Sequence, residues 1–247
     1  MRKDGPFFMA INITMLVSHT HKFIYLKTRK TAGTSVEAYF DQFCLPPNES
    51  SGHHDLVGRQ SKYGICSGRN DLTHIEPNID PDVQAYNVYN HMTAKELKQE
   101  LGDEIWSSYF KFCVVRNPWD RAVSMFWFKD SLLRWKLKNN PDLSLEEIKQ
   151  QFEYWLGRNR RWVEPDYNVW SIDGQCIVDD VIRYETINED SARLSLKFGK
   201  EFTELPRYKT GTRKQKHHYQ SYYTNPETLE KLTELFMPYC KQFGYTF

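Results

Sequence analysis

Residues 27–35 read Lys-Thr-Arg-Lys-Thr-Ala-Gly-Thr-Ser, and they are the most informative segment of the chain. It follows the apolar run Phe23–Leu26 and precedes a segment with helical apolar spacing, so it is a loop between a strand and a helix. Small and hydroxyl side chains leave backbone amides of such a loop available, and the helix N-terminus adds partial positive charge. The loop is therefore suited to hold an anion, with Lys30 supplying a full charge.

The helix after this loop is expected to begin at a capping box. Thr34 and Glu37 have the Ser/Thr-x-x-Glu spacing in which each side chain bonds the other's backbone amide. The apolar face that follows consists of Val36, Tyr39, Phe40 and Phe43. The loop is not a Walker A motif, because its lysine precedes the glycine instead of following it. An ordinary turn with solvated lysines is the other reading of the spacing alone.

A second strand-to-helix junction lies about ninety residues further along the chain. Residues 110–115 form a near-continuous apolar run, which is typical of a strand buried on both faces of a parallel sheet. Arg116 ends that run, Asn117 is a good N-cap, and Ser124 lies two turns into the helix. Arg116 and Ser124 could meet one phosphate, although Arg116 could instead pair with a carboxylate such as Asp120.

Other helix starts are marked by a capping residue ahead of helical apolar spacing, at Thr93, Ser144 and Asn225. The first of these helices should end before Gly102, and the second near Leu156. Residues 177–184 form a third strand candidate. Strands alternating with helices predict an α/β fold with a central parallel sheet flanked by helices, formed by residues 1–247 as a single domain.

Residues 45–82 differ in composition from the rest of the chain, because they are richer in glycine and proline. They carry four of the 12 glycines and four of the 11 prolines. Segments of this length without regular structure are usually lids, binding loops or disordered stretches. We interpret this one as a lid or acceptor-side excursion from the domain.

Composition excludes several classes of protein. The formal net charge of +1 gives no global field for nucleic acid or an anionic membrane, and no apolar stretch is long enough to span a bilayer. Five cysteines without a Cys-x-x-Cys pair indicate reduced thiols and a cytoplasmic location. The pairs His53-His54 and His217-His218 lack a liganding context, so no metal site is expected.

Together, the two junctions resemble a known family. Residues 30–35 (Lys30, Thr31, Ala32, Gly33, Thr34, Ser35) look like the 5′-phosphosulfate loop of sulfotransferases, and Arg116 with Ser124 looks like their 3′-phosphate site. The resemblance is to the carbohydrate-type branch, sulfotransferase family 2, which includes uronyl 2-O-sulfotransferases and bacterial homologues. It covers about Lys22 to Phe247, with landmarks at residues 184–185, 205–206 and 243–247. Arg29 stands where the family usually has proline.

The resemblance implies a P-loop-like three-layer sandwich that binds 3′-phosphoadenosine 5′-phosphosulfate. It implies sulfuryl transfer to an acceptor hydroxyl or amine, with 3′-phosphoadenosine 5′-phosphate as the product and no metal. A saccharide is the first expectation for the acceptor, and a lipid or a small-molecule alcohol stays open. His91 matches the family's catalytic base, and Lys30 would act on the leaving side. In the basic loop before the last helix, Thr210 and Arg213 match, in a looser register, the segment that closes over the nucleotide.

Two other functions are open at this stage. A P-loop kinase would need magnesium and usually a Walker A lysine, whereas a catalytically silent nucleotide-binding protein would keep the fold without turnover. A second basic cluster, formed by Arg158, Arg160 and Arg161, could receive an anionic acceptor or simply be a charged helix end.

Overall fold

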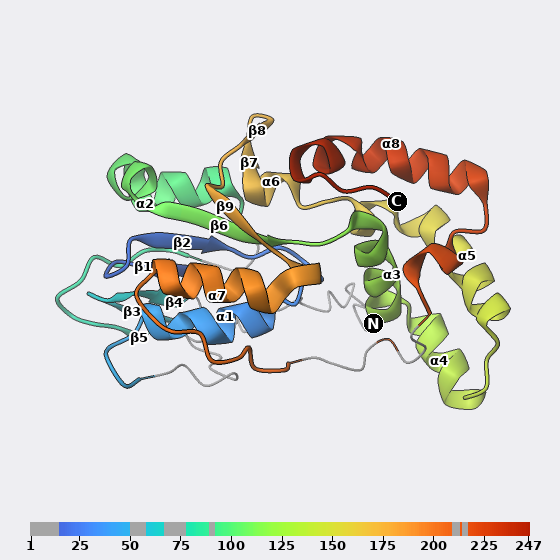
Figure 1. Ribbon diagram of the computed structural model, residues 1–247, viewed down its shortest axis with the longest axis horizontal. Helices are drawn as coiled ribbons and strands as arrows, with labels where there is room; N and C mark the ends of the chain where they lie inside the picture. Colours follow the sequence, from blue (N-terminus) through green and yellow to red (C-terminus); the bar gives the residue numbers. More distant parts are fainter. Residues whose placement is uncertain (1–14, 50–57, 67–77, 89–91, 209–212, 214–216) are drawn as a thin grey trace, which may run out of the picture.

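The central sheet contains seven strands in the computed structural model, which describes residues 15–49, 58–66, 78–88, 92–208, 213 and 217–247 (Figure 1). Their order is β5-β3-β4-β1-β2-β6-β9. The strands are Leu16–Ser18 (β1), Phe23–Leu26 (β2), Arg59–Ser61 (β3), Gly64–Cys66 (β4), Asn78–Ile79 (β5), Phe110–Val115 (β6) and Asp180–Arg183 (β9). A separate hairpin pairs Ser171–Ile172 (β7) with Gln175–Cys176 (β8).

The sheet is parallel where the two junctions lie and mainly antiparallel on its other side. β2 runs parallel to β6, and β6 runs parallel to β9. β1 is antiparallel to both β2 and β4, and β4 is antiparallel to β3. The described part of residues 45–82 thus adds edge strands to the sheet, a role that its turn-rich composition did not indicate. Its function as a lid stays a prediction.

The helices cover both faces of this sheet and extend past one end of it (Figure 1). They are Gly33–Phe40 (α1), Ala94–Ser108 (α2), Pro118–Lys129 (α3), Ser131–Asn139 (α4), Leu145–Val163 (α5), Tyr167–Trp170 (α6), Ile187–Lys197 (α7) and Pro226–Phe243 (α8). Short 3-10 turns occupy Asp41–Phe43 (η1), Tyr184–Thr186 (η2) and Tyr219–Tyr222 (η3).

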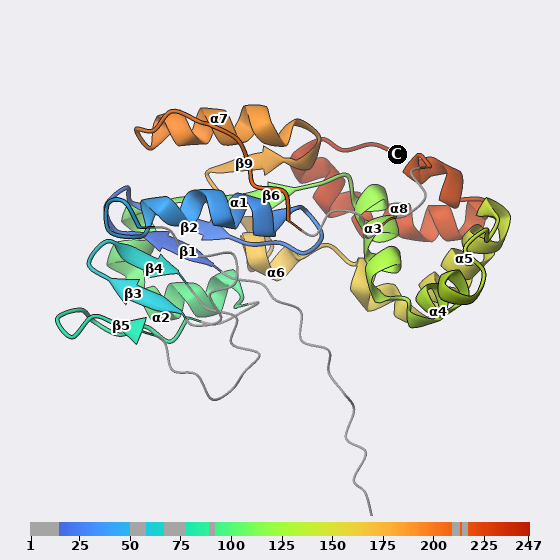
Figure 2. The same ribbon diagram turned by 90° about the horizontal axis from the view of Figure 1, so that it is seen from below.

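Alternate residues of β2 and β6 pack into two different hydrophobic cores, one on each face of the sheet. Tyr25 and Phe112 pack with α1 and α7 on one face, whereas Leu26 and Cys113 pack with α2, α6 and α8 on the other. Both views show these layers on opposite sides of the sheet (Figures 1 and 2). The continuous apolar run of residues 110–115 is explained by this double burial, and the predicted three-layer α/β fold is confirmed.

A third core lies beyond the carboxyl ends of β2 and β6. It joins α3, α4, α5, η3 and α8 through large buried rings, namely Trp119, Phe126, Phe152, Tyr222 and Phe236. Figure 2 shows this helical part beside the end of the sheet. Since α3 starts at the end of β6, the second junction lies where the sheet meets this helical core. In the part of the chain that the structure describes, no helix is both long enough and apolar enough to cross a bilayer.

Four predicted helix starts coincide with the structure. Thr93 and Ser144 form complete capping boxes, and Asn117 and Asn225 accept backbone amides ahead of a proline. The fifth start is wrong. α1 begins at Gly33 after Ala32, which has left-handed backbone angles, and no side chain caps it.

The Glu37 side chain does not form the predicted capping box, because it pairs with the buried ammonium group of Lys27. The Lys27 side chain is enclosed beneath the loop, and its Nζ forms an ion pair with Glu37. A buried ammonium needs such a partner far more than an exposed helix end needs a cap. The tertiary requirement therefore overrides the local motif.

One predicted helix end is confirmed, and the other differs from the structure. Within α2, Gly102 has non-helical backbone angles (φ 80°, ψ 162°), so the first helical segment ends there as predicted, and a second segment follows that packs Trp106 into the core. α5 passes Leu156 and reaches Val163, with a break in helical geometry at Asn159. Val163 is fully buried, and this packing extends the helix.

Gly64 is required by the close approach of β4 to β1. A Cβ atom at this position would lie 2.3 Å from the Val17 carbonyl oxygen. We expect Gly64→Ala to lower the free energy of unfolding by about 2 kcal/mol or more, because the backbone must shift. Gly157→Ala is the control, since its Cβ would meet nothing within 4 Å and should stabilise α5 by about 0.5–1 kcal/mol. Urea denaturation of both variants measures the difference, and equal stabilities would contradict the packing argument.

Candidate functional site

The loop between β2 and α1 has an unusual backbone. Lys30 and Ala32 have φ of 61° and 62°, in the left-handed region that residues other than glycine rarely adopt. Each such residue costs about 1–2 kcal/mol, and such strain clusters at ligand-binding sites. Turns of this kind can direct successive amides into one concavity, which suits an anion at the start of α1.

Hydroxyl groups fix this loop from beneath. Thr28 Oγ1 lies 2.9 Å from Thr31 Oγ1 and donates to the Val114 carbonyl of β6. Tyr25 Oη donates to the Gly33 carbonyl at 3.3 Å. The loop is thus bonded to both parallel strands, and the Thr31 side chain is turned into the structure.

The start of the loop is held by a buried carboxylate. Asp166 accepts hydrogen bonds from the Arg29 backbone amide at 2.6 Å and from Arg29 Nε at 2.5 Å. Behind it, the buried Arg121 has Nη1 4.0 Å from Asp166 Oδ2 and donates through Nη2 to the Val163 and Glu164 carbonyls. Burial lowers the pKa of the Arg121 guanidinium, and Asp166 acts in the opposite direction. The position where the family usually has proline is therefore tied down by an ion pair.

Arg116 joins the two junctions. Its Nη1 donates to the Lys30 carbonyl at 2.9 Å, and Nε and Nη2 donate to Asp120 Oδ2 at 2.9 and 2.7 Å. Within the described residues, these bonds engage three of its five N–H groups. The Tyr184 ring lies 3.9 Å from the guanidinium carbon and supports its plane.

A second arginine shares the same carboxylate. Arg213 Nη1 donates to Asp120 Oδ1 at 3.1 Å, and Arg213 also donates to the His217 carbonyl. Asp120 therefore lies between two guanidinium groups, Arg116 from the junction before α3 and Arg213 from the segment before η3. The ion pair between Arg116 and Asp120, which the sequence analysis considered as an alternative, is present. It orients the Arg116 guanidinium but does not use all of its N–H groups.

Tyrosine hydroxyls complete the support of the second junction. Tyr239 Oη accepts from the Arg116 amide at 3.1 Å and donates to the Arg116 carbonyl at 3.3 Å. Burial raises the pKa of Tyr239, so it stays neutral and can do both. Glu185 accepts from the Asn117 amide and from Tyr245 Oη, each at 2.8 Å. Burial and the Glu185 charge raise the pKa of Tyr245.

One cavity of about 1270 Å³ is lined by both junctions. Eight of the predicted site residues line it, namely Lys30, Ala32, Gly33, Thr34, Ser35, Arg116, Ser124 and Arg213. Parts of the three landmark segments also line it, including Tyr184, Pro206 and Tyr245. The Tyr208 backbone amide donates to Ser35 Oγ at 3.3 Å, and this bond holds the irregular segment after α7 against the loop.

Other predicted residues lie elsewhere. Thr31 faces away from the cavity, as described above. His91 and Thr210 lie outside the described residues. No described residue of 45–82 is among those that line the cavity, and the described residues contain no group of three or more His, Cys, Asp or Glu side chains placed to hold a metal ion.

Sequence reasoning missed three supporting residues. Asp166 and Tyr239 have no motif around them, and Glu185 was recognised only as a landmark. Each acts on a junction far away in the sequence, Asp166 at a separation of 137 residues and Tyr239 at 123.

An α/β sheet that ends in two adjacent cation-bearing junctions around one cavity is typical of proteins that bind phosphate or sulfate groups. The chain belongs to the sulfotransferase family, whose model matches residues 14–246. It is also similar to an uncharacterized protein of Archaeoglobus fulgidus, with 28% identity over 109 residues, which cover 44% of this chain and 82% of that protein. No solved structure matches the chain.

Asp166→Asn tests the anchor of the first loop. The change keeps the shape but leaves two guanidinium groups without their carboxylate, so we expect a loss of about 3–5 kcal/mol in the free energy of unfolding. Asp173→Asn is the control, because its pair with Lys95 is exposed and should contribute at most about 1 kcal/mol. Chemical denaturation compares the two, and similar small losses would show that Asp166 is not an anchor.

Proposed function

We propose that the chain transfers the sulfuryl group of 3′-phosphoadenosine 5′-phosphosulfate to a hydroxyl group of a saccharide. The observation that carries this is the Arg116 guanidinium, which donates to the Lys30 carbonyl of the first loop while Arg116 lines the same cavity as that loop. Membership of the family supports sulfuryl transfer in general. The donor, the acceptor class and the residue roles below are our proposal.

The first loop is proposed to bind the 5′-phosphosulfate. Its two left-handed residues and the start of α1 supply a polar concavity, and Lys30 supplies a charge at the cavity wall. Negative charge grows on the bridging oxygen as a sulfuryl group leaves, and a fixed cation there stabilises that charge by several kcal/mol. Lys30 would therefore both bind the donor and assist the leaving group.

The second junction is proposed to hold the 3′-phosphate. Arg116 is oriented by Asp120, and Ser124 lies on the cavity side of α3. Arg213, fixed by the same carboxylate, would add a second guanidinium, with Thr210 beside it in sequence. A planar fork and a hydroxyl together match the geometry of a phosphate group.

His91 is proposed as the general base. It lies two residues before Thr93, which caps α2, and its matched position in the family carries this assignment. An imidazole with a usual pKa of roughly 6.5 can accept the proton of the acceptor hydroxyl near neutral pH.

No metal is needed for these roles. All five cysteines are unpaired, which fits a reducing compartment.

Calorimetric titration with 3′-phosphoadenosine 5′-phosphate tests the donor site. We expect micromolar binding that does not depend on magnesium, with ATP much weaker. Arg116→Ala should weaken binding by roughly 1.5–3 kcal/mol, the range for hydrogen bonds to charged groups. Arg193→Ala, which removes an exposed arginine paired with Asp180, should leave affinity unchanged. Magnesium-dependent ATP binding would indicate a kinase, and unchanged affinity in Arg116→Ala would refute its placement.

His91→Ala tests the proposed base. Because the imidazole is proposed to act on the acceptor, we expect turnover to be largely lost while the product nucleotide still binds with the original affinity. A sulfuryl-transfer assay with a panel of saccharides, run alongside calorimetry, separates the two effects. An active His91→Ala variant would remove this residue from the mechanism.

A further inference from the structure

Three cations surround the ring of Trp162, near the C-terminus of α5. Lys129 Nζ lies 4.1 Å from the ring centroid, and the guanidinium carbons of Arg161 and Arg29 lie 5.5 and 5.9 Å from it. We call these four residues the Trp162 cluster. They come from the first loop, the end of α3 and the end of α5, so the fold brings them together from three separate segments.

Positive charge in this cluster is only partly balanced. Asp166 pairs with Arg29, but within the described residues neither Lys129 nor Arg161 forms an ion pair. Partial burial lowers the pKa of Lys129, and Arg29, Arg134 and Arg161 lower it further. Like charges held this close repel one another, and a bound anion would relieve that repulsion.

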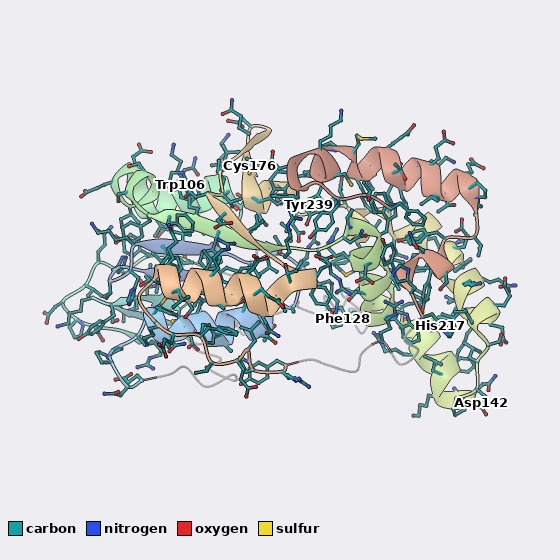
Figure 3. The ribbon with its side chains drawn as sticks, in the orientation of Figure 1. Trp106, Phe128, Asp142, Cys176, His217 and Tyr239 are labelled. Atoms are coloured by element: carbon teal, nitrogen blue, oxygen red, sulfur yellow. The ribbon has the colours of Figure 1, made fainter. Side chains whose placement is uncertain are left out.

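The cluster adjoins the cavity through Phe128. Lys30 Nζ lies 4.3 Å and Lys129 Nζ 5.7 Å from the centroid of the Phe128 ring. Both Phe128 and Arg29 line the cavity. Figure 3 places Phe128 on α3 near the end of the sheet, well away from Asp142 at the far tip of the helical part. A group bound at the cluster would therefore lie beside Lys30, the residue proposed to face the transferred sulfuryl group.

The donor does not account for these cations. Its proposed phosphate contacts are made by residues 30–35 and by Arg116, Ser124 and Arg213, none of which belongs to the cluster. The three arginines noted in the sequence are also divided by the structure. Arg158 lies over Tyr154 at 3.8 Å, whereas Arg161 faces Trp162.

We propose that the Trp162 cluster is the acceptor subsite and that it binds a negatively charged group of the saccharide, a carboxylate or a sulfate ester. Lys129 and Arg161 contact the anion, and the partly exposed Trp162 ring packs against both cations and holds them in place. This inference rests on the proposed function, because it places the acceptor next to Lys30.

Binding of charged dextrans to the full chain tests this subsite. With the donor site saturated by 3′-phosphoadenosine 5′-phosphate, calorimetry compares carboxymethyl-dextran, dextran sulfate and neutral dextran of equal length. The double variant Lys129→Gln/Arg161→Gln should bind the preferred charged dextran at least about tenfold more weakly, with unchanged nucleotide affinity. Lys138→Gln, which removes one exposed charge on the neighbouring helix α4, is the control and should bind as the unaltered chain does.

The outcomes separate the inference from the proposed function. Tighter binding of the carboxylated or of the sulfated polymer supports the subsite and identifies the anionic group. Equal binding of neutral dextran, unchanged affinity in the double variant, or an equal loss in Lys138→Gln would overturn it. Failure of the nucleotide to bind would instead contradict the proposed donor, and the same dextran comparison without nucleotide would still decide the cluster.

Discussion

The parallel pairing of β2 with β6 is the constraint on which the site depends. Parallel neighbours end at the same edge of a sheet, so the loop after β2 and the turn after β6 must lie side by side. The Thr28 bond to Val114 and the Arg116 bond to the Lys30 carbonyl are made across this pair. Neither contact could form if the two strands were separated by another strand. The cavity and its cations follow from this one neighbour relation.

Buried charges then fix what the sheet brings together. Lys27 with Glu37, Arg29 with Asp166 and Arg116 with Asp120 each hold a loop by an ion pair that has little access to water. Removal of one partner from such a pair is costly, because the other charge remains desolvated. The result is a polar wall whose side chains have few alternative positions. A preorganised wall of this kind favours binding and stabilisation of charge during a transfer reaction.

Local signals were sufficient for much of this architecture. The apolar runs predicted β2 and β6, and capping residues at Thr93, Asn117, Ser144 and Asn225 predicted where their helices begin. They failed where a distant contact decided the outcome. Glu37 pairs with Lys27 instead of forming the predicted capping box. Residues 59–66 form strands of the central sheet, although their sequence is rich in turn formers. In the site, the two loops could be predicted from motif spacing, but Asp166 and Tyr239 could not, because no local pattern links them to the strands that they support.

The separation of β2 from β6 in the sequence has a consequence for how the protein forms. Lys30 and Arg116 are 86 residues apart in the chain, and the segments between them contribute α1, the strands β3, β4 and β5 at one side of the sheet, and α2. Contacts of such long range form slowly, because the intervening chain must lose its freedom before they can contribute stability. During synthesis, the first loop therefore emerges well before the strand that positions it. The bonds that hold its two strained residues in place, from Thr28 to Val114 and from Arg116 to Lys30, form only once β6 has been added, so the geometry of this loop is completed late in folding.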